Sequence, residues 1–174
     1  MSDEAQRETS ALVIPAFGKS PALSLEMSKT REGEKRIIEA KTVNPATYAE
    51  LEYTYNEAYR ELVKNSAMLG YQITLAEKAL EDAKATILLD KYPDFMKDKP
   101  KTQDNADLRK AFMMRDDDYV AALDRINMLK ANLAFVDGRV KVFERTCSYM
   151  KKRMDLLIRS GLSGADMYIT HGRK

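Results

Sequence analysis

The sequence contains few of the residues that mark several common classes of protein. Its 174 residues include one cysteine, one histidine, no tryptophan, seven glycines and five prolines. The single cysteine, Cys147, excludes an internal disulfide framework and a cysteine-based zinc site of ordinary spacing. No histidine lies near Cys147 in the sequence, and there is no glycine-rich phosphate loop. We therefore expect no catalytic residues, no metal site and no cofactor.

Long hydrophobic runs are also missing. No apolar segment approaches the roughly 18 residues that a membrane-spanning helix requires, and no signal-peptide pattern opens the chain. We expect a cytoplasmic protein that does not associate with a membrane.

The residues that are abundant favour a soluble, helical chain. Charged residues make up 32% and hydrophobic residues 44% of the sequence, and the good helix formers Ala, Leu, Glu, Lys and Arg are prominent. The length corresponds to one modest domain. We predict an all-α fold.

Residues 1–43 carry no sustained hydrophobic period. They contain Pro15, Gly18, Pro21 and Gly33, several Ser and Thr residues, and the charged run TREGEKR. This composition predicts a flexible N-terminal arm. The apolar segment ALVIPAF within it either folds against a partner or stays unstructured, and the sequence leaves both alternatives open.

A first long helix is predicted to begin at Pro45, within a helical domain over residues 44–161. Asn44 is a suitable N-cap, and proline is tolerated at the first helical position because an N–H there has no intrahelical partner. From Tyr55 onward, apolar or small residues recur at alternating spacings of four and three: Tyr55, Tyr59, Leu62, Ser66, Leu69, Ile73, Ala76, Leu80, Ala83 and Ile87. This heptad pattern predicts a helix that ends near Tyr92 and Pro93, followed by a linker over residues 92–104.

A second helical stretch repeats the same spacing from Leu108. Its positions are Leu108, Phe112, Arg115, Tyr119, Ala122, Ile126, Leu129, Leu133, Val136, Val140, Phe143, Cys147, Met150, Met154 and Leu157. Together the two stretches predict a long antiparallel helical hairpin with heptad seams. The run Asp116, Asp117 and Asp118 either caps a new helix that starts at Tyr119 or lies within one long helix, and the sequence favours neither reading.

The second stretch also has another apolar column, which repeats every seven residues. It consists of Met114, Ala121, Met128, Phe135, Val142, Tyr149 and Leu156. In a helix this column lies roughly 100° around the axis from the nearer seam column, so a single partner helix does not cover both faces. We therefore expect a homo-oligomer, formed as a ring, in which Met114, Met128, Phe135, Val142, Tyr149 and Leu156 mediate self-association.

Positive charge is concentrated at the C-terminal end. Residues 139–174 include nine basic and three acidic side chains, a net charge of +6, whereas the whole chain has a net charge of +2. Lys141, Arg145, Lys152 and Arg159, here called the basic stripe, follow the helix face opposite the seam, and Lys151 and Arg153 flank them. Such asymmetry indicates an acidic partner such as nucleic acid, although a solvated helix end that suits the helix dipole is the alternative.

Gly161 is predicted to end the second helix and to begin a basic C-terminal tail over residues 162–174. The tail carries Tyr168, His171, Arg173 and Lys174. An aromatic ring among basic groups is able to stack on an unpaired base, and a frayed terminus is the other reading.

The order of these features resembles the UvsY-type recombination mediators of phages. The resemblance covers roughly residues 45–165 and lies in the ELVKNS segment, the LLDKY sequence before a charged linker, the aspartate-rich start of the second helical half and the terminal RSG. It implies a helical homo-oligomeric ring that binds single-stranded DNA, helps to displace the single-strand-binding protein and loads a RecA-like recombinase. The family's basic segment at the end of the first helical region is represented here by Lys84 and Lys91 alone, which suggests that DNA contacts have shifted toward the C-terminal stripe.

Two other classes of function remain open from the sequence. The chain is also compatible with a coiled-coil adaptor whose basic stripe contacts an acidic protein, and with an inhibitor that sequesters a host factor. On the mediator hypothesis, the candidate DNA-binding residues are Lys84, Lys91, Lys141, Arg145, Lys151, Lys152, Arg153, Arg159, Tyr168, Arg173 and Lys174.

Overall fold

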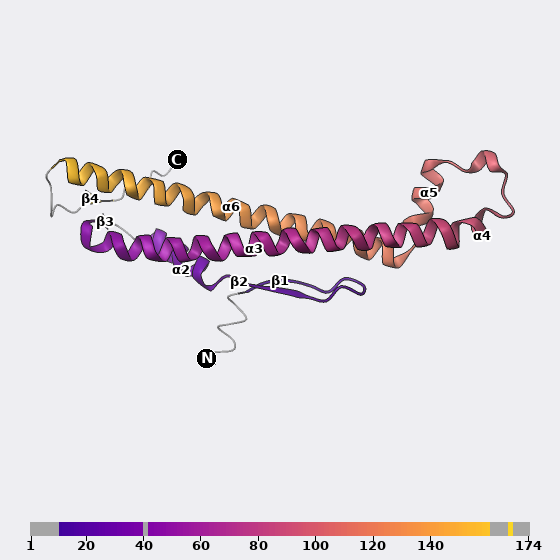
Figure 1. The fold of residues 1–174 in the computed structure, drawn as a ribbon, viewed down its shortest axis with the longest axis horizontal. Coiled ribbons are helices and arrows are strands. Elements are labelled where there is room, and N and C mark those ends of the chain that lie inside the picture. Colours follow the sequence, from indigo (N-terminus) through magenta and orange to yellow (C-terminus); the bar gives the residue numbers. More distant parts are fainter. Residues whose placement is uncertain (1–10, 40–41, 161–166, 169–174) are drawn as a thin grey trace. The chain divides into compact units, whose positions relative to one another are not determined.

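The structure, a computed structural model, describes residues 11–39, 42–160 and 167–168. The described chain is mainly helical, as predicted (Figure 1). Its helices are α2 Ser28–Glu39, α3 Pro45–Thr86, the π-helix η1 Ile87–Lys91, α4 Tyr92–Met96, the 3-10 helix η2 Lys101–Gln103, α5 Ala106–Met113 and α6 Asp117–Arg159. Two small sheets accompany them: β1 Ala11–Ile14 pairs with β2 Leu23–Glu26, and β3 Thr42–Val43 pairs antiparallel with β4 Met167–Tyr168.

Helix α3 begins where the sequence predicts. The Thr47 backbone N–H donates to Asn44 Oδ1 at 2.9 Å, so Asn44 caps the helix just before Pro45. All ten heptad positions from Tyr55 to Ile87 are buried or half-buried. The core of α3 also includes Leu51, Ala58 and Asn65, which are buried but do not belong to the predicted series.

The helical path does not end near Tyr92 and Pro93. It continues through η1 and then α4, where Pro93 occupies one of the first two positions. A proline within a helix lacks the N–H that would donate to the preceding turn. The π-helix directly before α4 changes the local hydrogen-bonding pattern at this point, so that the chain stays helical through a residue that usually ends a helix.

The aspartate run interrupts the second helical stretch. Helix α5 ends at Met113, and the Tyr119 backbone N–H donates to Asp116 Oδ1 at 3.2 Å, which makes Asp116 a cap for α6. Of the two readings that the sequence leaves open, the one with a new helix is therefore confirmed. Arg115, the one non-apolar member of the predicted series, is exposed in the connection between the two helices.

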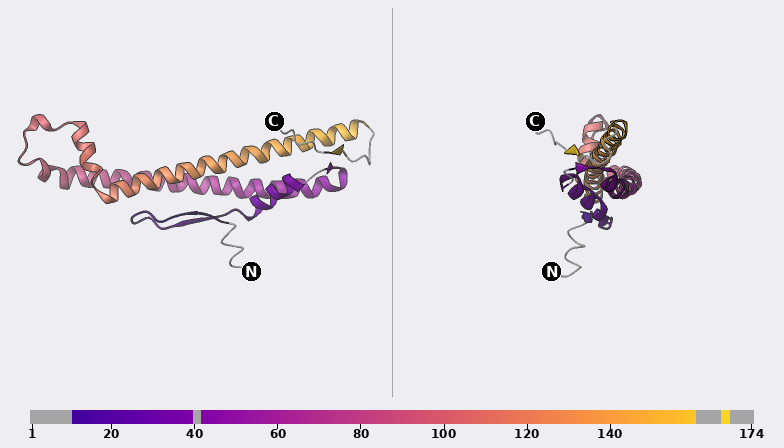
Figure 2. Two further views of the ribbon diagram at one scale, coloured as in Figure 1. Left: turned by 180° about the vertical axis from the view of Figure 1, so that it is seen from behind. Right: turned by 90° about the vertical axis from the view of Figure 1, so that its left-hand side faces the viewer.

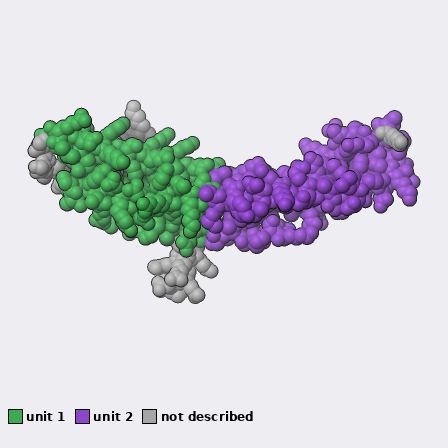
Figure 3. All heavy atoms as spheres, in the orientation of Figure 1, with its two compact units in different colours: residues 1–12, 25–66, 134–174 green, residues 13–24, 67–133 purple. Residues whose placement is uncertain are grey.

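The chain divides into two compact units, which are coloured separately in Figure 3. Unit 1 comprises residues 1–12, 25–66 and 134–174, and unit 2 comprises residues 13–24 and 67–133. In unit 1 the first half of α3 runs antiparallel to the second half of α6. The rings of Tyr55 and Phe143 lie 6.1 Å apart, and Ser66 Oγ donates to Asp137 Oδ1 at 2.8 Å.

Helix α2 also belongs to the core of unit 1, where it lies alongside α3 (Figure 2). The Glu61 carboxylate on α3 accepts hydrogen bonds from the Thr30 backbone N–H at 2.7 Å and from Thr30 Oγ1 at 2.8 Å, at the N-terminal end of α2. Asn65 Nδ2 donates to the Glu26 carbonyl at 2.7 Å. The side chains of Leu25, Met27 and Thr30 are buried.

The prediction of a flexible arm is therefore wrong for residues 11–39. These residues form two strands and a helix that are held by side chains of α3, and residues 1–10 lie outside the described part. The segment has no hydrophobic period of its own because its order depends on hydrogen bonds and contacts with residues that are distant in sequence. The hydrophobic pattern of a short segment does not predict such contacts.

Unit 2 contains the other halves of the two long helices, again antiparallel, with Lys130 Nζ 2.9 Å from Glu77 Oε1. The turn between β1 and β2 packs on α6. Arg125, which is buried, donates through Nη1 to the Pro15 carbonyl at 2.6 Å. Gly18 adopts φ +51°, and a Cβ at this position would lie 3.1 Å from the Ala121 Cβ. Glycine is required here both for its backbone conformation and for the close approach.

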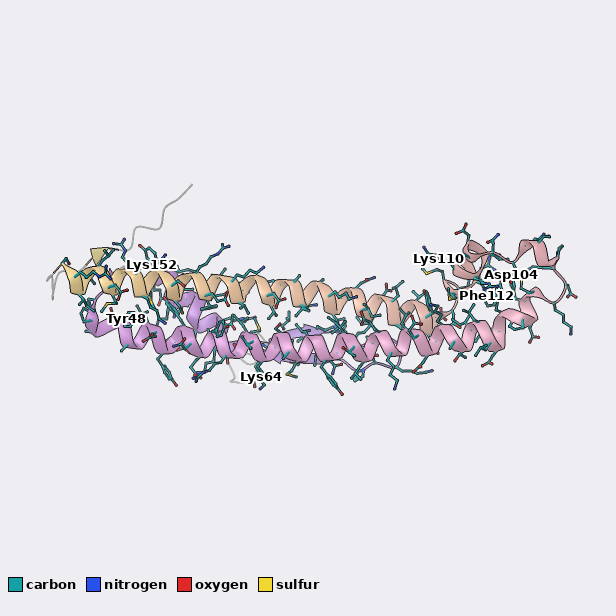
Figure 4. The ribbon with its side chains drawn as sticks, turned by 45° about the horizontal axis from the view of Figure 1, so that its top comes forward. Tyr48, Lys64, Asp104, Lys110, Phe112 and Lys152 are labelled. Carbon is teal, nitrogen blue, oxygen red and sulfur yellow. The ribbon has the colours of Figure 1, made fainter. Side chains whose placement is uncertain are left out.

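The predicted linker over residues 92–104 contains regular structure. Helix α4 and η2 fall inside it, and the Tyr92 ring is buried within 5.4 Å of the Phe112 ring and 5.9 Å of the Phe95 ring. The hydroxyl of Tyr92 donates to Asp104 Oδ1 at 2.8 Å, and Figure 4 shows Asp104 and Phe112 close together. The aromatic residues of the segment thus give the connection a small apolar core of its own.

Candidate nucleic-acid interface

The C-terminal half of α6, in unit 1, has one buried face and one charged face. Val136, Phe143, Met150 and Leu157 recur every seven residues and are each at most 3% exposed. The four residues of the basic stripe are all exposed, as is the flanking Lys151, while Arg153 is half-buried. Because an α-helix has 3.6 residues per turn, the same sequence places a hydrophobic edge against α3 and a cationic edge in solvent.

The cations of this face have few partners in the protein. Within the described residues, Lys141, Arg145, Lys151, Lys152 and Arg159 make no ion pair. Residues 134–160 contain seven basic and three acidic side chains. Five unpaired cations along one half-helix produce a positive surface potential that attracts anionic ligands.

Two of the three acidic side chains in this half-helix are engaged by α3. Asp137 accepts the hydrogen bond from Ser66, and Glu144 Oε1 accepts from the Tyr59 hydroxyl at 3.5 Å. Asp137 thus directs its charge toward α3, whereas Glu144 stays exposed beside Arg145 and Lys152. The outer face consequently keeps most of its positive charge.

Six of the seven residues of the second apolar column are exposed, and those in unit 1 lie beside the basic stripe. Met114, Met128, Phe135, Val142, Tyr149 and Leu156 are between 39% and 55% exposed, the first two in unit 2 and the other four in unit 1. Contiguous exposed apolar residues commonly mark an interaction surface. The structure thus leaves uncovered the residues that the sequence assigns to oligomerisation.

Tyr149 is an aromatic residue of the second apolar column, and a neighbouring arginine holds its side chain. Arg153 Nε donates to its hydroxyl at 2.8 Å, and the guanidinium carbon of Arg153 lies 5.3 Å from the ring centroid. A shallow hollow of about 320 Å³ surrounds the ring and is lined by Glu144, Arg145, Ser148, Tyr149 and Lys152. Sequence reasoning placed Tyr149 only among the oligomerisation residues, although its spacing from Arg145 and Lys152 was visible in the sequence.

Other predicted DNA-binding residues do not join this face. Lys84 and Lys91 belong to unit 2, where Lys84 Nζ lies 3.6 Å from Glu81 and Lys91 is ion-paired with Asp116. The pair with Lys91 is the main reason that the pKa of Asp116 is lowered and that the pKa of Lys91 is raised. Each lysine therefore already has an acidic partner in the folded chain.

The predicted contacts of the C-terminal tail lie outside the described side chains. Tyr168 forms part of β4, whose backbone pairs with Thr42, and its side chain is not described. Gly161, His171, Arg173 and Lys174 lie outside the described residues altogether. Figure 4 locates Lys152 on α6 and Lys64 on the side of α3 that faces away from α6.

A second hollow, in unit 2, has a volume of about 350 Å³ between the β1–β2 turn and the two long helices. Four of its five charged groups form two ion pairs, with Lys19 Nζ 3.0 Å from Asp118 Oδ2 and Lys91 in contact with Asp116, while the fifth is Asp82. Such internal pairing leaves little net charge with which to select a ligand.

The remaining chemistry of the described chain is limited. Burial raises the pKa of the half-buried Cys147, which keeps this thiol protonated at neutral pH. Among the described residues, no group of three or more His, Cys, Asp or Glu side chains is arranged to hold a metal ion. None of the described helices combines the length and the apolar character that crossing a membrane would require.

Comparison with protein-family models, with curated proteins and with solved structures finds no match.

Proposed function

We propose that the protein binds single-stranded DNA through the exposed face of the second half of α6, and that it acts as an oligomeric recombination mediator. The observation that carries the proposal is the set of five exposed cations on this half-helix, which make no ion pair within the described residues. Phosphate oxygens are the anions that lysine and arginine side chains of this kind bind along a nucleic-acid backbone.

The mediator role rests on the resemblance to UvsY-type proteins. On this proposal the chain forms a ring through the second apolar column, helps to displace the single-strand-binding protein, and loads a RecA-like recombinase onto the strand. Repetition of a weak site around a ring raises its effective concentration on a long strand. Long strands are therefore bound much more tightly than short ones.

The proposal is tested by fluorescence anisotropy with labelled single strands of increasing length at several salt concentrations. Each phosphate neutralised on a single strand contributes about 0.7 to the logarithmic salt slope. The double variant Lys152→Glu with Arg159→Glu is expected to bind more weakly and to lower the magnitude of the slope by about 1.4. The subunit number is expected to stay unchanged, because neither side chain belongs to the second apolar column.

The matched control is the double reversal Lys64→Glu with Lys78→Glu, which changes two exposed lysines of α3. It alters the net charge by the same amount but leaves the basic stripe intact, so its affinity is expected to remain close to that of the wild type. A wild type that fails to bind at low salt, or a stripe reversal that binds as well as the control, would refute the DNA-binding proposal.

The loading step is measured separately, with a bacterial RecA on a strand coated with single-strand-binding protein. The wild type is expected to shorten the delay before RecA assembles. DNA binding without any such acceleration would remove the mediator role while leaving the interface in place.

The second candidate is a coiled-coil adaptor or an inhibitor that binds an acidic protein. The same unpaired cations favour it, because they are equally able to meet carboxylates. Failure of DNA binding in an oligomeric wild type would make this candidate the leading one.

A further inference from the structure

Tyr149 differs from its aliphatic neighbours in the second apolar column. Its ring is 41% exposed, and the hydrogen bond from Arg153 Nε to its hydroxyl fixes one end of the side chain. Because Arg153 lies one turn further along α6, the contact restrains the ring from within the same helix. A ring held in one orientation stacks on a planar ligand with a smaller loss of conformational entropy.

The cations around the ring are placed to contact an anion on either side of it. Arg145 precedes Tyr149 by four residues and Lys152 follows it by three, so both lie next to Tyr149 on the helix surface. Both line the same hollow as the ring, and neither makes an ion pair within the described residues. Glu144, the acidic residue of the hollow, accepts a hydrogen bond from Tyr59 on α3.

The charge around the ring favours a nucleotide over a second copy of this chain as the occupant. In a two-fold contact, the same face of another copy would bring Arg145 and Lys152 toward their own equivalents, and like charges placed together oppose such a contact. A nucleotide is complementary to the ring of Tyr149 and to the two cations of the hollow that make no ion pair within the described residues, because it combines a flat aromatic base with negatively charged phosphates.

We propose that Tyr149 stacks on a base of single-stranded DNA and that Arg145 and Lys152 bind the phosphates on either side of that nucleotide. This inference rests on the proposed function, and it adds to it a defined nucleotide subsite on α6. Stacking on an aromatic side chain accepts every base, so the subsite gives affinity without sequence preference. Within unit 1, it leaves Phe135, Val142 and Leu156 as the residues of the second apolar column that remain for contacts between copies.

The experiment compares a labelled oligothymidylate with an abasic strand that has the same number of phosphates. The wild type is expected to bind the thymidine strand about tenfold more tightly per occupied subsite, which corresponds to the loss of one stacked base. Tyr149→Leu is expected to lose this preference while keeping its affinity for the abasic strand. Tyr149→Phe retains the ring and is expected to keep most of the preference.

Tyr53→Leu is the matched control. Tyr53 is an exposed tyrosine of unit 1 at 68%, but its neighbours one turn away are the acidic Glu50 and Glu57. The cations next to these carboxylates, Arg36 and Arg60, are already ion-paired with them. Its replacement is expected to leave both affinities unchanged. Light scattering of each variant reports the subunit number alongside the binding data.

The possible failures are distinguishable. A wild type that binds neither strand would remove the proposed function itself. A wild type that binds the two strands equally, or a Tyr149→Leu variant that keeps the preference, would overturn the stacking subsite and leave DNA binding intact. A lower subunit number in Tyr149→Leu, with equal losses for both strands, would assign the ring to a contact between copies and overturn the inference.

Discussion

Gly33 and Gly138 both lie in helices, and their surroundings decide what a side chain would do there. A Cβ at Gly33 would lie 2.7 Å from Phe143 Cε1 and 2.9 Å from the Ala58 Cβ, whereas a Cβ at Gly138 would have no neighbour within 4 Å. At Gly33 the absence of a side chain lets α2 approach the two long helices closely. At Gly138 no such contact exists.

This difference predicts opposite effects for the same substitution. Gly138→Ala is expected to stabilise the protein by up to about 1 kcal/mol, because alanine has the higher helix propensity. Gly33→Ala gains the same propensity, but it forces apart well-packed atoms at a cost of about 1–3 kcal/mol, so we expect a net loss of stability. Urea unfolding followed by circular dichroism measures both. A stabilised Gly33→Ala variant would show that α2 does not pack in this way.

Glu61 shows how one side chain orders a distant segment. Its carboxylate accepts from the backbone N–H groups of Lys29, at 3.2 Å, and Thr30, at 2.7 Å, which are among the first N–H groups of α2 and have no partner within that helix. A carboxylate at this position also interacts favourably with the positive end of the helix dipole. The start of α2 is thus stabilised by a residue that lies 31 positions further along the chain than Thr30.

At the scale of elements, the segment from α4 to α5 is organised around Asp104. Arg109 donates to the two carboxylate oxygens of Asp104 through Nε at 2.8 Å and Nη2 at 2.7 Å, and the Tyr92 hydroxyl donates to Oδ1. The hydrogen bonds from Arg109, followed by the one from Tyr92, lower the pKa of Asp104 to about 2. This bidentate salt bridge, together with the hydrogen bond from Tyr92, fixes the start of α5 relative to α4.

The lowered pKa predicts an acid-dependent change within this segment. The ordinary pKa of aspartate is about 3.9, so the stabilisation from charged Asp104 is complete above about pH 4 and is lost as the pH falls through about 2. Nuclear magnetic resonance of the Asp104 carboxyl carbon measures the midpoint. Arg109→Gln is expected to move it back toward the ordinary value. A wild-type midpoint near 4 would contradict the structure at this pair.

At the scale of the whole molecule, the exposed apolar column predicts self-association. Val142 on α6 and Val63 on α3 are both in unit 1 and are 45% and 43% exposed, but only Val142 belongs to the column. We expect the wild type to be larger than its 19.8 kDa monomer in light scattering at micromolar concentration. Val142→Glu is expected to lower the subunit number, because a charge buried at an interface without a partner is costly.

Val63→Glu provides the control for this experiment and is expected to keep the wild-type subunit number. Circular dichroism should show that both variants stay helical, since neither position is buried within the chain. A monomeric wild type, or equal losses in the two variants, would show that the column does not hold copies together.

The features that depend on local geometry could be predicted from the sequence alone. The heptad spacing identified most of the buried positions of α3 but not Leu51, Ala58 and Asn65. Asn44 and Pro45 marked its first turn, and the predicted basic stripe of α6 carries exposed cations. These predictions succeed because a helix repeats every 3.6 residues, so the side chains on one face are fixed by their spacing alone. The seven residues of the second apolar column were found in the same way.

The features that depend on contacts between distant residues could be identified only in the folded chain. Residues 11–39 are ordered through Glu61, Asn65 and Arg125, and Lys91, a predicted DNA contact, is ion-paired with Asp116. Short strands and a short helix such as α2 bury too little on their own to form without these partners. No local hydrophobic period therefore predicts the structure of these segments. They fold because the long helices bring their hydrogen-bonding partners close to them.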